Sequence, residues 1–155
     1  KPSQAFKALA LGAPYVKAVC MSRSFMLPAF LGCNIEGALH PERRERVHGA
    51  WSALPKTVLD IGDTPETIFA GYHALKERLG ADEMAHIPYG AIAMWTMCDR
   101  LGAGLQHHMA GARKFGVEHI DRTDICAANR ETAQETGIPF ITEQDDELAR
   151  RIVLG

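Results

Sequence analysis

The first 33 residues restrict the fold of this chain most, because a helix pattern is followed at once by an apolar strand pattern. Residues 3–11 are rich in strong helix formers, and Gly12 marks the end of that helix. Pro14 excludes further helix, and residues 15–20 form a short and nearly continuous apolar run. A helix, a short turn and a buried strand are typical of parallel α/β folds. The sequence therefore predicts that this segment closes a repeating β/α architecture.

The rest of the chain carries helix signals and almost no strand signals. Thr64 suits the N-cap of a helix and Pro65 its first position, and Gly80 marks the end of that helix. Pro88 opens the longest predicted helix, which ends near Lys114. Two further helix starts and one charged helix with a solvated face are predicted at Asp121, at Thr142 and over residues 41–50.

Small residues recur inside the longest predicted helix. Each glycine there costs about 1 kcal/mol of helix stability relative to alanine. Their presence therefore predicts close packing of this helix against another element or a ligand. The glycines concerned are Gly90, Gly102, Gly104 and Gly111.

Composition excludes several classes of protein. Hydrophobic residues make up 46% and charged residues 23% of the 155 residues, which is ordinary for a globular domain. The net charge of −2 and the lack of a Lys/Arg block give no sign of a nucleic-acid surface. No apolar run approaches the roughly 20 residues that a membrane span needs. The four cysteines are scattered without a CxxC pair, which favours free, mostly buried thiols and a reducing cytoplasm.

The turn after the apolar run combines Met21, Ser22 and Arg23. In a (β/α)8 barrel, the loop after the last strand and the short helix behind it frequently bind phosphate. Backbone N–H groups at a helix N-terminus point toward the anion, and the helix dipole adds to the attraction. The alternative interpretation is a polar strand-to-helix turn with a surface arginine. The spacing of these residues leaves both interpretations open.

Several segments of the chain are similar to one family of flavin enzymes. Lys7-Ala8-Leu9-Ala10-Leu11-Gly12-Ala13, followed by the apolar run and by Met21-Ser22-Arg23, resembles the last barrel unit of FMN-dependent glutamate-synthase-type enzymes. The rest of the chain resembles the C-terminal region of the stand-alone FMN-binding glutamate synthase family. The segments that carry this second resemblance are residues 65–72, 109–115, 129–133 and 136–139.

The resemblance implies an α/β fold, namely the C-terminal segment of an FMN-binding (β/α)8 TIM barrel. Residues 1–33 would form the last β/α unit, and residues 34–155 a mainly α-helical extension that packs on the barrel. The implied activity is an oxidoreductase that forms glutamate from 2-oxoglutarate and an amino or ammonia donor. Ser22 and Arg23 would contact the FMN phosphate, Ser22 chiefly through its backbone N–H. The resemblance assigns no catalytic residue to this chain.

Two departures from the family pattern concern the same turn. Ser22 stands where the family usually has glycine, which makes a positive φ less comfortable. The larger members carry a three-cysteine iron–sulfur motif just after the turn, whereas only Cys33 lies nearby here, so no cluster is expected. Because one strand cannot form a barrel, the chain alone is expected to be mostly helical and to bind FMN weakly at best. Its expected partner is an N-terminal barrel portion of the same protein, and a homo-oligomer is possible.

His107, His108 and Cys20 are further residues that could carry chemistry. His107 and His108 suggest a metal site, but adjacent helical residues diverge by about 100°, so no metal is expected. Cys20, at the end of the apolar run, is expected to be a packed and inert thiol. The alternative to an enzyme fragment is a non-catalytic helical assembly module, or a free-standing helical protein, that binds no flavin.

Overall fold

A computed structural model describes residues 1–46 and 51–154 of the chain. These residues form α-helices and 3-10 helices, and within these two ranges there is no β-strand. One isolated parallel β-bridge joins Ala127 and Phe140. The predicted α/β fold, with its strand and its TIM barrel segment, is therefore wrong, and the fold is mainly helical.

The apolar run at residues 15–20 shows why the strand prediction fails. Residues 16–20 have no regular secondary structure, and Tyr15 is 89% exposed. Val16 and Val19 are also exposed. A strand requires the hydrogen-bonding ladder of a neighbouring strand, and no described segment provides one here. The alternation and apolarity of a sequence predict a strand only if such a neighbour exists.

The chain divides into two compact units. Unit 1 combines Lys1–Val19 with Gly104–Gly155, and unit 2 is Cys20–Ala103. The longest helix, α7 (Tyr89–Gly111), contributes its first part to unit 2 and its last part to unit 1. The predicted division after residue 33 stays a prediction.

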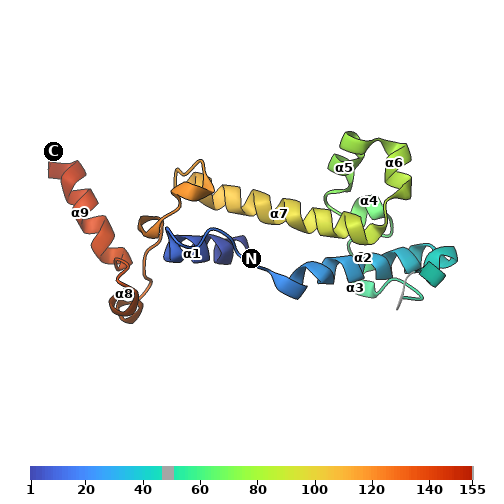
Figure 1. The fold of residues 1–155 in the computed structure, drawn as a ribbon, viewed down its shortest axis with the longest axis horizontal. Helices are drawn as coiled ribbons and strands as arrows, with labels where there is room; N and C mark the ends of the chain where they lie inside the picture. The colour runs from blue at the N-terminus through green and yellow to red at the C-terminus, as the bar shows by residue number, and fades with distance from the viewer. Residues whose placement is uncertain (47–50, 155) are drawn as a thin grey trace. The chain divides into compact units, whose positions relative to one another are not determined.

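Unit 2 consists of short helices around α2 (Met26–Leu39) and the first part of α7 (Figure 1). The 3-10 helix η1 (Ser22–Phe25) runs directly into α2. The remaining elements are η2 (Pro41–Arg46), α3 (Lys56–Leu59), α4 (Pro65–Ile68), α5 (Tyr72–Leu79) and α6 (Ala81–His86).

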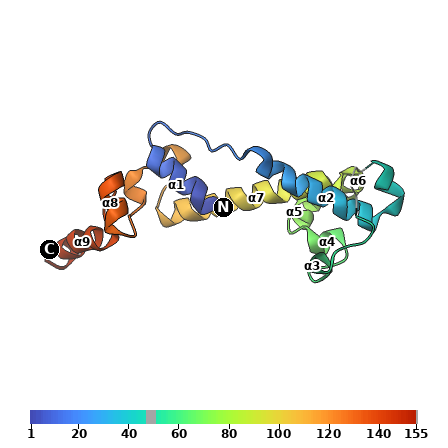
Figure 2. The same ribbon diagram turned by 90° about the horizontal axis from the view of Figure 1, so that it is seen from below.

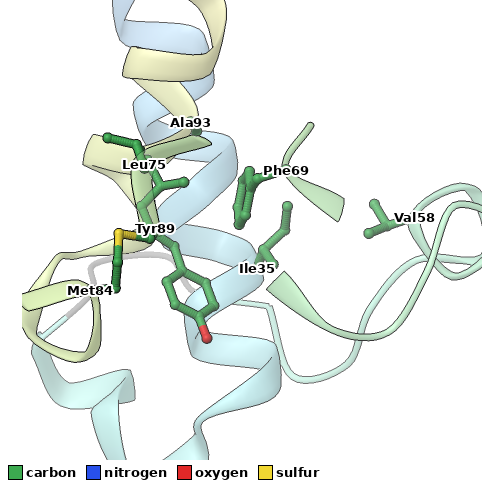
Figure 3. Close-up of a cluster of buried hydrophobic side chains, with 8 residues drawn as sticks. Ile35, Val58, Phe69, Leu75, Met84, Tyr89 and Ala93 are labelled. Carbon is green, nitrogen blue, oxygen red and sulfur yellow. The ribbon is translucent and has the colours of Figure 1, made fainter. Parts of the chain in front are cut away.

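Figure 3 shows the apolar core of unit 2, whose buried side chains come from α2, α3, α5, α6, α7 and the residue that follows α4. Ile68 of α4 packs against this core. Ile35 of α2 and Ile92 of α7 are fully buried. The rings of Phe69 and Tyr89 meet edge to face, with 5.7 Å between their centroids. The other buried members of the cluster are Val58, Leu75, Met84 and Ala93.

Helix α2 lies beside the first part of α7 in both views (Figures 1 and 2), and glycines allow the close approach at their contact. A Cβ on Gly32 would lie 2.6 Å from the Tyr89 carbonyl carbon and 2.8 Å from Gly90 Cα. A Cβ on Gly90 would lie 2.9 Å from Cys33 Sγ. The predicted close packing of α7 is therefore confirmed at Gly90.

Unit 1 packs α1 (Pro2–Gly12) against the end of α7 and the loop that follows it. Gly104 belongs to this contact, since its Cβ would lie 2.8 Å from Pro2 Cβ. In contrast, a Cβ on Gly102 or Gly111 would meet no atom within 4 Å, so close packing is wrongly predicted there. The buried side chains of unit 1 around this contact are Phe6, Leu9, Ala10, Met109 and Ile120.

The rest of unit 1 is formed by η3 (Val117–His119), η4 (Arg122–Asp124), α8 (Arg130–Thr136) and α9 (Ile141–Leu154). Asp121 is the N-cap of η4, as predicted, and forms a capping box with Asp124. The predicted start at Thr142 is wrong by one residue at least, because α9 already includes Ile141.

The predicted helices of unit 2 are only partly confirmed. The helix that Thr64 caps stops at Ile68, and a second helix runs from Tyr72 to Leu79. It ends at Gly80, whose φ of 86° suits glycine, as predicted. The charged segment forms the 3-10 helix η2, and residues 47–50 of that prediction lie outside the described residues. None of the described helices has the length and apolarity to cross a membrane.

Candidate functional site

Ser22 and Arg23, the predicted phosphate contacts, lie at the start of a helical segment in unit 2. They are the first residues of η1, and η1 continues into α2. Both side chains are exposed. The N–H of Ser24 donates to the Met21 carbonyl oxygen over 3.1 Å, which closes the first turn. The N-terminus of this helical segment is therefore reachable from solvent at the predicted position, but the strand expected to precede it is missing.

Ser22 has a backbone conformation that favours glycine. Its φ is 46°, within the left-handed region that residues with a Cβ seldom adopt. Among non-glycine residues of the described chain, only Arg113 shares this feature, with a φ of 57°. The positive φ turns the chain from the extended segment into η1. The unfavourable positive φ predicted for a serine at this position is thus present in the structure.

A buried carboxylate lies in the last part of α2. Glu36 is 7% exposed, and its carboxylate accepts two hydrogen bonds. The donors are Arg43 Nη1 at 3.1 Å and the backbone N–H of Tyr89 at 3.1 Å. Tyr89 is the first residue of α7, where backbone N–H groups have no partner within the helix. Glu36 therefore connects α2, η2 and the start of α7.

The Tyr89 side chain extends this network. Its hydroxyl group and His40 Nε2 form a hydrogen bond of 2.9 Å, and His40 Nδ1 lies 3.2 Å from the Glu42 carboxylate. Burial raises the pKa of Tyr89 to about 12, with the neighbouring Tyr72 as the second cause. Tyr89 thus stays protonated at neutral pH. The network therefore holds the helices together through hydrogen bonds of the neutral phenol.

Sequence reasoning missed this network. It assigned Arg43 and Arg44 to a solvated helix face, whereas Arg44 donates from Nε to the Gly37 carbonyl oxygen over 2.7 Å. Its Nη2 also donates to the Ser52 carbonyl oxygen over 2.7 Å. The available signal was Glu36 itself, the one charged residue in the largely apolar sequence of α2. Burying a carboxylate costs much free energy unless hydrogen-bond donors contact it, so a carboxylate in such a helix indicates a nearby donor.

The cysteines differ from the expected buried thiols. All four are free, but Cys20, Cys98 and Cys126 are exposed. The packed position expected for Cys20 is therefore wrong. Cys33 is partly buried, and burial followed by the nearby Glu36 charge raises the pKa of its thiol. A raised pKa keeps Cys33 in the thiol form, which is a poor nucleophile.

Unit 1 has an open groove of about 1100 Å³ beside the loop that follows α7. Lys114 lies in this groove, 3.1 Å from Asp121 and 3.5 Å from Asp124. Asp121 also accepts hydrogen bonds from the Thr123 hydroxyl at 2.5 Å and the Thr123 N–H at 2.8 Å. These Thr123 bonds, followed by Lys114, lower the pKa of Asp121 to about 2. No group of three or more metal-ligating side chains occurs among the side chains that the structure describes, which are those of residues 1–45, 51–143 and 150–154.

The lowered pKa of Asp121 predicts an acid-sensitive unit 1. A carboxyl group whose pKa falls on folding stabilises the folded state above its ordinary value of 3.8. That stabilisation is lost as the pH falls toward 2. We expect Asp121→Asn to flatten the decline of stability between about pH 4 and pH 2, measured by urea unfolding at each pH. Parallel stability curves for the variant and the parent chain would contradict the proposed role of Asp121.

Comparisons with known proteins leave the family resemblance untested. The sequence matches no protein-family model, and searches of the curated proteins and of the solved structures find no match. The function therefore has to be inferred from the residues and the geometry described above.

Proposed function

We propose that this chain contributes to the FMN site of a glutamate-synthase-type oxidoreductase, which forms glutamate from 2-oxoglutarate and an amino or ammonia donor. The observation that carries the proposal is the φ of 46° at Ser22. The resembled family usually has glycine at this position, and glycine is the residue that adopts such a φ without strain. The agreement between the family motif and the local backbone supports the assignment of this turn.

The surroundings of the turn suit a phosphate group. Backbone N–H groups at the start of η1 favour an anion, and the dipole of the helical segment that η1 and α2 form adds to the attraction. The exposed Arg23 guanidinium would supply charge-assisted hydrogen bonds. FMN, when bound and reduced by an external electron donor, would carry the electrons that the reaction needs. This chain's own residues would hold its phosphate.

The exposed apolar surface near the turn supports a further polypeptide segment in the intact protein. Tyr15 and Val19 precede the turn, and both are exposed. Covering them would remove apolar area from water at about 25 cal/mol per Å². A cytoplasmic location belongs to the same proposal, because the four cysteines are all free.

The test compares flavin binding by variants of the turn. We expect the full natural polypeptide to show visible flavin absorbance, and Arg23→Ala to weaken FMN binding by about 2 kcal/mol, roughly thirtyfold. Ser22→Gly should retain FMN and raise the melting temperature, because glycine relieves the positive φ. Arg78→Ala, in the exposed last turn of α5, serves as a charge control. Unchanged FMN affinity in Arg23→Ala would refute the proposed contact.

A second candidate function is a helical assembly module without flavin. It is favoured by one face of α2, where four large apolar side chains at helical spacing are between 44% and 69% exposed. These are Met26, Leu27, Phe30 and Leu31. A colourless full polypeptide that self-associates, as measured by sedimentation, would favour this function over the flavin enzyme.

A further inference from the structure

We infer that the open groove of unit 1 is a second binding site, separate from the Ser22 turn, for a small molecule that carries phosphate groups and a planar ring, such as a nucleoside diphosphate. The groove of about 1100 Å³ is large enough for a ligand of this size. Its lining includes the cationic side chains of Lys17, Arg113, Lys114 and Arg122, and two carboxylates, Glu118 and Asp121. The chain as a whole carries a net charge of −2, so this lining is unusually positive.

The cations of the groove fall into two groups. Lys114 is paired with Asp121 and Asp124, and an Arg122 Nη2 group donates to the Thr136 carbonyl oxygen. In contrast, neither Lys17 nor Arg113 forms an ion pair with any residue that the structure describes.

The side chains of Lys17 and Arg113 are both exposed. Glu118 lies 3.8 Å from His119, on the same lining. Lys17 and Arg113 are therefore the groups available to an incoming anion.

Arg113 has a left-handed backbone conformation, in which glycine would be more stable. It follows the end of α7, where its N–H donates to the Ala110 carbonyl oxygen at 3.0 Å and the Lys114 N–H donates to the Met109 carbonyl oxygen at 2.8 Å. These two bonds form a Schellman motif, in which the left-handed residue is usually glycine. Arg113 is that residue, with a φ of 57°.

The helix dipole does not explain the arginine at this position. A cation gains from the dipole at any position in the last turn, so it needs no strained conformation to do so. Residues held in strained conformations cluster at functional sites. The strained arginine, together with the cationic groove that it lines, points to a role for the guanidinium in holding an anion.

The apolar part of the groove suits a ring. Phe115 lines it and is 94% exposed, so both faces of its ring are accessible. Pro14, Val16 and Val117 add apolar surface to the same lining. Aromatic side chains stack on the bases of nucleotides, whereas an inorganic anion gains nothing from them. The exposed aromatic ring, together with the available cations, favours a nucleotide over an inorganic anion as the ligand.

The experiment measures binding of ADP and of inorganic pyrophosphate by isothermal titration calorimetry, together with melting temperature. We expect the chain to bind both, ADP more tightly. Arg113→Gly should lower ADP affinity about tenfold while raising the melting temperature by roughly 3 °C, because it removes a charge and relieves the positive φ. Arg113→Lys should retain most of the affinity. Phe115→Ala should weaken ADP about tenfold and leave pyrophosphate unchanged.

Controls separate this site from the Ser22 turn and from general charge effects. Arg78→Gln removes one exposed positive charge from unit 2 and should leave ADP affinity unchanged. Arg23→Ala should also leave it unchanged, so failure of one site is distinguishable from failure of the other. The inference is overturned if the parent chain does not bind ADP, if Arg113→Gly binds ADP as tightly as the parent, or if Arg78→Gln weakens ADP equally.

Discussion

Replacing Glu36 with alanine is expected to destabilise unit 2 by about 3 kcal/mol. The substitution removes the acceptor of two hydrogen bonds, from Arg43 and from the Tyr89 N–H. The Tyr89 N–H lies at the buried start of α7 and would keep no partner, which is the costly outcome for a polar group. The Arg43 side chain is partly exposed and would bind water instead. The loss of its bond to Glu36 therefore lowers the free energy of unfolding by less. The measurement is urea unfolding followed by circular dichroism.

Glu36→Gln provides the matched control for this prediction. Glutamine keeps an oxygen that can accept from the Tyr89 N–H, but it loses the charge that faces Arg43. We expect it to cost about 1 kcal/mol, well below the alanine variant. If both substitutions cost the same, the charge on Glu36 rather than its hydrogen bond to α7 would hold the helices. If neither is destabilising, Glu36 does not join α2 to α7.

The second large effect is expected at the contact of α2 with α7. Gly32→Ala should destabilise unit 2 by about 3 kcal/mol, because the added methyl group would overlap with the backbone of Tyr89 and Gly90. Backbone atoms on a packed helix cannot move aside as the end of a side chain can. The two helices would have to separate, and the core around Ile35 and Ile92 would open with them.

The control for this prediction is a glycine of α7 that faces open space. Gly102 has no neighbour within 4 Å of an added Cβ. We expect Gly102→Ala to stabilise the chain by about 1 kcal/mol, since alanine is the better helix former. Thermal unfolding of both variants should therefore shift in opposite directions. A stable Gly32→Ala chain would show that α2 and α7 are not in close contact at this point.

Helix ends were predictable wherever a single residue type decides the local backbone. Gly80 ends α5 with a positive φ, and the Asp121–Asp124 capping box begins η4. The glycines of α7 were predictable only as a group. Gly90 and Gly104 meet neighbours, while Gly102 does not, and nothing in their local sequence separates these cases.

The candidate site shows the same division. The position of Ser22 at the start of a helical segment followed from the turn residues, and the serine has the strained φ that its sequence position suggested. The Glu36 network was not predicted, because its acceptor and the Tyr89 donor are 53 residues apart. The same holds for the unpaired cations of the groove, since Lys17 and Arg113 come from segments distant in the chain.

The amino-acid order was sufficient to indicate where helices begin and end, because capping and backbone preference act within a few residues. It was not sufficient to decide whether residues 15–20 form a strand, which carboxylate is buried, or which glycine touches a neighbour. Those outcomes depend on which surfaces the folded chain brings together, and hydrogen-bonding ladders and packing contacts form only between such surfaces. The extended and exposed segment at Val16 and Val19 is the clearest example, since an apolar run becomes a strand only beside another strand.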